Sequence, residues 1–111
     1  MKGAVILQEA REVYGDDKQM AVAMEELAEL AAVLSKYFRY DNKDKAIEEL
    51  HDKVISEVAD VYIILEHVKA IFELKPRDIE QMQFLKLTRL SRWLEFSDSP
   101  EQTLVDRGLH E

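Results

Sequence analysis

The chain has 111 residues, of which 47% are hydrophobic, with only 3 Gly and 2 Pro, a composition that favours one compact, helix-rich domain. Its formal net charge of −8 disfavours nucleic-acid backbones and anionic membranes, because binding to either depends on clustered Lys and Arg. The chain has no cysteine, which excludes disulfides and thiolate metal sites and fits a cytoplasmic protein. No apolar run reaches the length of about 18 residues needed to span a membrane, and the apolar start is too short for a signal-peptide core.

Turn-forming residues divide the sequence into four main helices, and no alternating strand pattern appears. The expected helices span about 3–14, 16–38, 45–74 and 77–96. Gly15 should end the first helix, Asp16 or Asp17 should cap the second, and Pro76 should separate the third from the fourth. We expect an all-α catalytic domain over residues 1–96 and a tail over 97–111, where a capping box with Pro100 predicts a short helix.

The second and third helices are apolar on more than one side. On the second helix, residues repeating at three- and four-residue steps predict a core stripe of Met20, Ala23, Met24, Leu27, Ala31, Leu34 and Phe38. Val22 and Val33 form another stripe on the same helix, with Glu26 and Glu29 between them. Helices that are apolar around most of their circumference are enclosed by neighbours, so we expect this four-helix bundle to be completed by oligomerisation, as a dimer or tetramer.

Two clusters of carboxylates interrupt these apolar helices: Glu25, Glu26 and Glu29 in the second, and Glu57 and Asp60 in the third. No Lys or Arg lies three or four positions from the first three, where a helical ion pair would form. Bare buried carboxylates are costly, so these groups must be protonated, paired or bound to cations. Residues three apart share a helix face, so two antiparallel helices could bring four carboxylates to one point. Oxygen ligands in this number suit Mg²⁺ or Mn²⁺.

A surface role explains the same residues without a metal. Glu25 and Glu29 would then face solvent, and Lys53 would pair with Glu57. For a single glutamate-rich helix this is the better interpretation. Two clusters at matching spacing, both in apolar surroundings, favour the metal site instead.

Residues 25–29 (Glu-Glu-Leu-Ala-Glu) followed by residues 57–60 (Glu-Val-Ala-Asp) resemble the EExxE…ExxD signature of the MazG-like, all-α nucleoside triphosphate pyrophosphohydrolases. The resemblance covers roughly residues 7–94. It includes Asp17-Lys18-Gln19 ahead of the glutamates and the later basic segment 84–90. It is to small single-domain members, of the kind often found in phages and mobile elements.

The resemblance implies a role for each residue of the signature. Four carboxylates would bind Mg²⁺, or Mn²⁺ in its place: Glu26, Glu29, Glu57 and Asp60. Glu25 would lie beside them as an outer ligand or as a base that orients water. Lys53, Lys86 and Arg89 would contact the substrate phosphates, and Gln19 is a candidate contact to the base or sugar. Attack of metal-activated water on the α-phosphorus would convert a (deoxy)nucleoside triphosphate to the monophosphate and pyrophosphate, clearing unwanted nucleotides from the pool.

Two other functions compete with this one. A non-catalytic oligomerisation or regulatory module could keep the same helices, although the complete set of four carboxylates argues against lost catalysis. Glu48 and His51 match half of the ligand set of a di-iron bundle, which needs two such pairs. We expect His51 to face solvent instead, and His67 to lie at a surface or interface.

Overall fold

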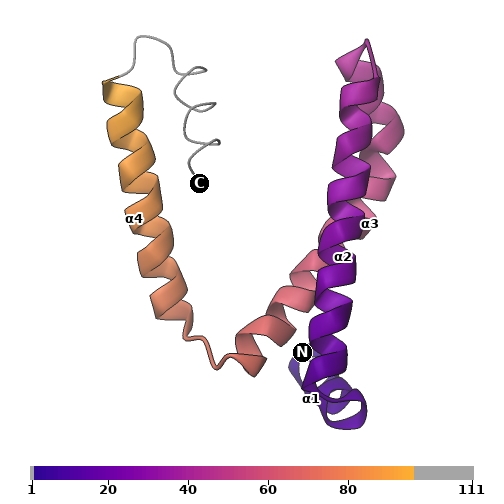
Figure 1. Cartoon of the computed structure of the whole chain (residues 1–111), viewed down its shortest axis with the longest axis vertical. Coiled ribbons are helices and arrows are strands. Elements are labelled where there is room, and N and C mark those ends of the chain that lie inside the picture. Colours follow the sequence, from indigo (N-terminus) through magenta and orange to yellow (C-terminus); the bar gives the residue numbers. More distant parts are fainter. Residues whose placement is uncertain (1, 97–111) are drawn as a thin grey trace. The chain divides into compact units, whose positions relative to one another are not determined.

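The computed structural model of the protein describes residues 2–96, and all four main helices are present (Figure 1). They are α1 (Gly3–Tyr14), α2 (Asp16–Lys36), α3 (Lys43–Ile71) and α4 (Pro76–Glu95), with a short 3-10 turn, η1 (Tyr37–Arg39), after α2. No strand occurs within these described residues, so the predicted all-α class is confirmed. The predicted short helix in the tail lies outside them. No helix between residues 2 and 96 is long and apolar enough to cross a membrane.

The chain divides into two compact units, Met1–Glu73 and Leu74–Glu111. The first unit contains α1, α2 and α3, and the second contains α4. All five candidate carboxylates lie in the first unit, on α2 and α3.

Local sequence explains where these helices begin and end. Gly15 has a φ of 85°, a left-handed conformation that favours glycine, and it separates α1 from α2. Asp16 and Asp17 lie in the first turn of α2 and neither caps it with a side-chain hydrogen bond, so the predicted cap is wrong. Their charges still complement the positive end of the helix dipole. At the start of α3, the side chain of Asn42 accepts a hydrogen bond from the backbone N–H of Lys45 at 3.1 Å.

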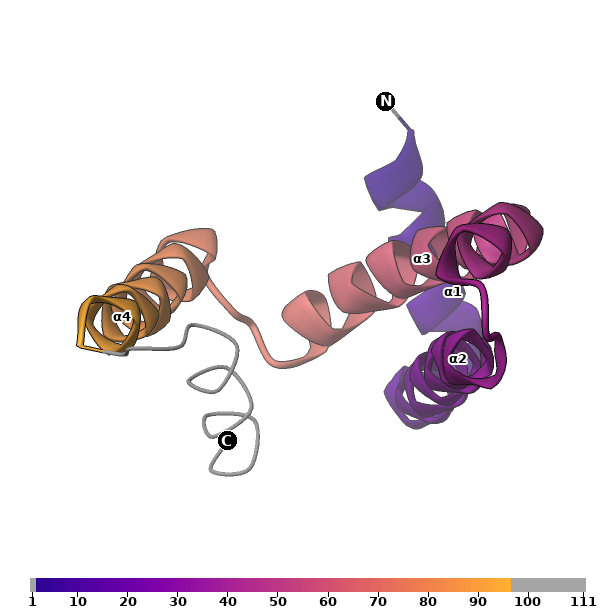
Figure 2. The ribbon, with the colours of Figure 1, turned by 90° about the horizontal axis from the view of Figure 1, so that it is seen from above.

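Lys43 fixes the connection between α2 and α3. Its Nζ atom donates to the backbone oxygens of Tyr37 and Tyr40, at 2.9 and 2.7 Å. The same ammonium lies 4.7 Å from the centre of the Tyr37 ring, a cation–π contact. With the turn held in this way, α2 and α3 run side by side as an antiparallel pair (Figures 1 and 2).

The interior of the first unit lies between α2 and α3. Ala23, Val61 and Ile64 form its buried cluster, and Val22, Leu30 and Val68 pack against them. The face of α2 that meets α3 therefore passes through the glutamates, at residues 19, 23, 26, 30 and 33. Our predicted core stripe is wrong for most of its large residues: Met24, Leu27, Leu34 and Phe38 are exposed on the single chain. Apolar periodicity alone cannot choose between two stripes on one helix, and α3 covers the one that carries the carboxylates.

Apolar surface remains uncovered elsewhere on the first unit. Met24 and Phe38 keep 68% and 78% of their surface exposed, values unusual for large apolar side chains. A groove of about 430 Å³ runs between the end of α2 and the start of α3 and is lined by aliphatic and aromatic side chains. Its lining consists of Val33, Leu34, Tyr37, Phe38, Ala46, Ile47, Leu50 and Val54.

Candidate metal centre

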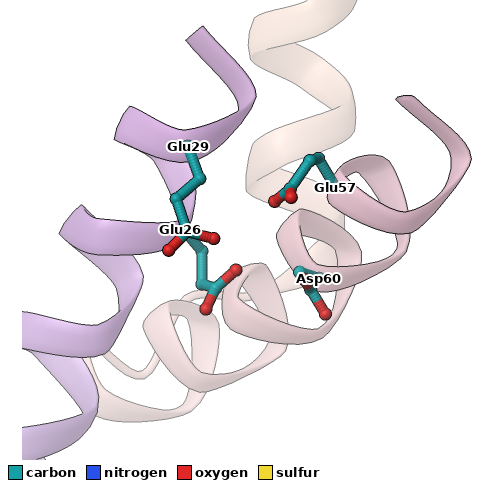
Figure 3. Close-up of side chains that lie close together, drawn as sticks. All are labelled: Glu26, Glu29, Glu57 and Asp60. Carbon is teal, nitrogen blue, oxygen red and sulfur yellow. The ribbon is translucent and has the colours of Figure 1, made fainter. Parts of the chain in front are cut away.

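Four carboxylates meet where α2 and α3 face each other (Figure 3). Glu26 and Glu29 project from α2, and Glu57 and Asp60 project from α3. Each of the four side chains contributes one oxygen, and these four oxygens all lie within 4.8 Å of one another. Each pair is three residues apart on its own helix, so both members point to the same side, and the antiparallel packing brings the two pairs together.

The cluster is buried at its centre and open at its edge. Glu57 is 3% exposed, Glu26 and Asp60 are half-buried, and Glu29 is exposed to solvent. The Oε2 atoms of Glu57 and Glu26 are buried, and neither has a hydrogen-bond partner within residues 2–96. Buried carboxylate oxygens almost always have a partner in folded proteins, so these two are candidate ligands for a cation.

Lys53 supplies only part of that positive charge. Its Nζ atom lies 3.0 Å from Oε1 of Glu57, one turn along α3. The hydrogen bond to Glu57 and the charge of that carboxylate raise the pKa of Lys53, so the lysine stays charged. The surface interpretation expected this ion pair, and it is present together with the four-carboxylate cluster. One lysine facing four carboxylates leaves an excess of negative charge.

The pKa of Glu26 is raised, in part by this excess of negative charge. Its partial burial raises the pKa above the ordinary glutamate value, and the negative charges of Glu29 and Asp60 raise it further. The folded protein therefore resists ionising the Glu26 carboxyl. A bound cation would reverse this effect, because it favours the charged form of each ligand.

The donors fit a hard divalent cation. All four are carboxylates, with no imidazole or thiolate among them, which is the preference of Mg²⁺, Mn²⁺ and Ca²⁺. Oxygens on opposite sides of one Mg²⁺ lie about 4.2 Å apart, twice the metal–oxygen bond length. The observed 4.8 Å spread is slightly larger, and rotation of one carboxylate closes such a gap. The orphaned oxygen of Glu57 supports the same conclusion, since it is buried and has no other partner.

A cavity of about 200 Å³ adjoins the cluster. Glu26 and Asp60 line one part of it, and Gln19, Val22, Ile64 and His67 line the rest, together with Ile63. Gln19, the candidate substrate contact, is thus brought next to two of the carboxylates. His67 is only 4% exposed within the single chain, so our expectation of a surface or interface position is wrong. Its spacing could have revealed it, because residues 57, 60, 64 and 67 repeat at three- and four-residue steps on α3.

The remaining predicted site residues are Glu25, Lys86 and Arg89. Glu25 is exposed on α2, beside Glu26 in sequence but not among the four grouped carboxylates. Lys86 and Arg89 are exposed on α4, in the second unit of the chain. Their contact with phosphates stays a prediction. His51 is exposed as expected.

Comparison with protein-family models, with curated proteins and with solved structures finds no match for this chain.

Stability measurements test the metal site directly. Adding Mg²⁺ or Mn²⁺ at about 100 times its dissociation constant should stabilise the fold by about 2.7 kcal/mol, a rise in unfolding temperature on the order of 10 °C. Glu26→Gln should raise the unfolding temperature in chelator, because it removes one of the repelling charges, and should reduce the rise caused by metal.

In chelator, the free energy of unfolding of the wild-type protein should fall as the pH rises from 4.5 through the raised pKa of Glu26, since the folded state binds that proton more tightly than the unfolded state.

Glu48→Gln is the matched control, because Glu48 is exposed on α3 and lies outside the cluster. It should leave the response to metal unchanged. Equal unfolding temperatures with metal and with chelator, measured on the wild-type protein, would contradict the site.

Proposed function

We propose that this protein is an Mg²⁺-dependent nucleotide pyrophosphohydrolase of the MazG-like type, which cleaves a (deoxy)nucleoside triphosphate to the monophosphate and pyrophosphate. One observation carries the proposal: four carboxylate oxygens from two helices lie within 4.8 Å of one another around a buried, unpartnered oxygen of Glu57. The order of these residues along the chain supports the resemblance to that family. Mn²⁺ would serve in place of Mg²⁺.

Electrostatics favours a phosphate substrate at this site. A triphosphate and four carboxylates repel each other, so they can share one place only when cations lie between them. When bound, the metal would neutralise both sets of oxygens and polarise the phosphate that is attacked. Glu26, Glu29, Glu57 and Asp60 would hold it from one side. The exposed position of Glu29 and the half-buried position of Asp60 leave the opposite side open to solvent and substrate.

Lys53 has a place in this scheme. In the structure its ammonium neutralises the charge of the Glu57 carboxylate, and a bound cation would take over that role. The lysine side chain is 60% exposed, so its long stem can turn toward a phosphate once Glu57 has another partner. Lys86 and Arg89 would add contacts to the outer phosphate oxygens, since Arg and Lys are the usual phosphate ligands in proteins. Glu25, exposed next to Glu26, would orient water at the edge of the site.

Hydrolysis of a nucleotide panel in ¹⁸O-labelled water tests the reaction. Attack on the α-phosphorus places the label in the nucleoside monophosphate, whereas attack on the β-phosphorus places it in pyrophosphate, and mass spectrometry separates the two. We expect labelled monophosphate from at least one triphosphate. Glu57→Gln and Asp60→Asn should lower kcat/KM by about 100-fold or more, because even the outer partners of metal ligands cost 10–100-fold.

Glu48→Gln serves again as the control and should keep wild-type activity with intact helical circular dichroism. If no common, deoxy or damaged triphosphate is cleaved with Mg²⁺ or Mn²⁺ present, the proposed enzyme function is wrong. Iron-dependent absorbance after aerobic reconstitution would favour the di-iron alternative.

The exposed apolar surface of the first unit favours assembly into a homodimer or homotetramer. Met24, Leu27 and Leu34 recur at three- and seven-residue steps on α2, the spacing of a helix–helix seam. This surface is also the observation that supports the second candidate function, a helical oligomerisation or regulatory module without catalysis. An enzyme and an assembly module can share the surface, so only the hydrolysis experiment separates the two.

Light scattering coupled to gel filtration tests the assembly. The wild-type protein should elute with a mass two or four times the chain mass of 12.9 kDa. Leu34→Lys should shift it toward the monomer, because it places a charge in the apolar seam. Ser35→Lys adds the same side chain about 100° around the helix and should not do so. A monomeric wild-type protein at micromolar concentration would show that the apolar surface has another purpose.

A further inference from the structure

The cavity beside the carboxylates is built around two buried polar side chains. Gln19 is 8% exposed and His67 is 4% exposed, and both line it. Within residues 2–96 the Gln19 amide makes no hydrogen bond, although an amide offers two donors and an acceptor. A ligand in the cavity could therefore use both the donors and the acceptor of this amide. The rest of the lining is apolar at Val22, Ile63 and Ile64 and acidic at Glu26 and Asp60.

Arg11 on α1 defines the chemistry that His67 presents. Its Nη1 atom lies 3.1 Å from Nδ1 of His67, although the two residues are 56 positions apart. A guanidinium can only donate, so Nδ1 must accept, and the imidazole proton is on Nε2. Burial lowers the pKa of His67 and the charge of Arg11 lowers it further, which keeps the ring neutral. His67 therefore presents an Nε2–H donor, and α1 holds the ring in that tautomer.

The cavity lies next to the candidate metal centre and shares two carboxylates with it. Glu26 and Asp60 belong to both, so a ligand in the cavity would adjoin a group held at the carboxylates. His67 is seven residues beyond Asp60 on α3, which is about 10 Å along the helix. The base of a nucleotide lies one sugar away from its α-phosphate, in keeping with this offset. The volume of about 200 Å³ is below the 300–1,000 Å³ typical of ligand pockets, so one ring fits better than two.

We propose that this cavity binds the base of a pyrimidine nucleotide, with His67 donating from Nε2 to a carbonyl oxygen of the ring and Gln19 bonding an adjacent polar edge. Arg11 is a positioning residue that acts through His67. The inference rests on the proposed nucleotide function and adds the substrate class. The neighbouring apolar side chains would pack on the ring and exclude water from these hydrogen bonds.

Binding of non-hydrolysable nucleotides tests this subsite without relying on turnover. The probes are the α,β-imido analogues of the uridine, cytidine, adenosine and guanosine triphosphates, titrated with Mg²⁺ by calorimetry. Pyrimidine analogues should bind at least about 10-fold more tightly than purine analogues, the equivalent of one lost hydrogen bond or a poor fit. His67→Leu should weaken pyrimidine binding about 10-fold, and His67→Gln, which keeps a donor, should restore part of it. Arg11→Met should give a smaller loss in the same direction.

Two controls keep the outcomes distinct. His51→Leu changes an exposed histidine on the same helix and should leave binding unchanged. Mn²⁺ affinity should be the same in the wild type and in His67→Leu, because the carboxylates are untouched. Equal affinity for purine and pyrimidine analogues, or wild-type affinity in His67→Leu, would overturn this inference even if hydrolysis is observed. Selective pyrimidine binding without any hydrolysis would support the subsite while contradicting the enzyme.

Discussion

Like charges held together between two packed helices are the constraint on which this structure depends. The interface of α2 and α3 is apolar at Ala23, Val61 and Ile64, yet the same faces carry four carboxylates. Apolar packing supplies the free energy that holds the helices together, and it brings the carboxylates close as a consequence. Lys53 relieves part of the repulsion and leaves a buried oxygen of Glu57 without a partner. An arrangement that stores repulsion in its interior has a physical reason to bind a cation.

The sequence was sufficient to predict the two carboxylate pairs, and the antiparallel packing of α2 and α3 then brings the pairs together. Glu26 and Glu29, like Glu57 and Asp60, are three residues apart, so each pair shares a face whatever the helix packs against. The helix boundaries at Gly15 and Pro76 were also predicted, since both residues act locally on the backbone, whereas the Asn42 cap of α3 was not. These predictions depend on neighbours in the sequence and need no knowledge of tertiary contacts.

Predictions that depend on tertiary packing were less accurate. Met24, Leu27 and Leu34 repeat as regularly as a core stripe, but α3 covers the adjacent face, and the choice between two apolar faces is made by the partner helix. His67 was expected at a surface or interface, and its contact with Arg11 on another helix could not be predicted from the spacing within α3. The cavity shared by Gln19 and His67 has the same origin, because α2 and α3 each supply part of its lining. No spacing within one helix could reveal a contact across 56 residues.

Anomalous diffraction from crystals grown with Mn²⁺ can show whether the four carboxylates bind a cation, because it locates the ion independently of any activity. We predict an anomalous peak within bonding distance of oxygens from Glu26, Glu29, Glu57 and Asp60, about 2.2 Å for a hard divalent cation of this size. Mn²⁺ at saturating concentration with no peak between α2 and α3, and with Lys53 still bonded to Glu57, would contradict it.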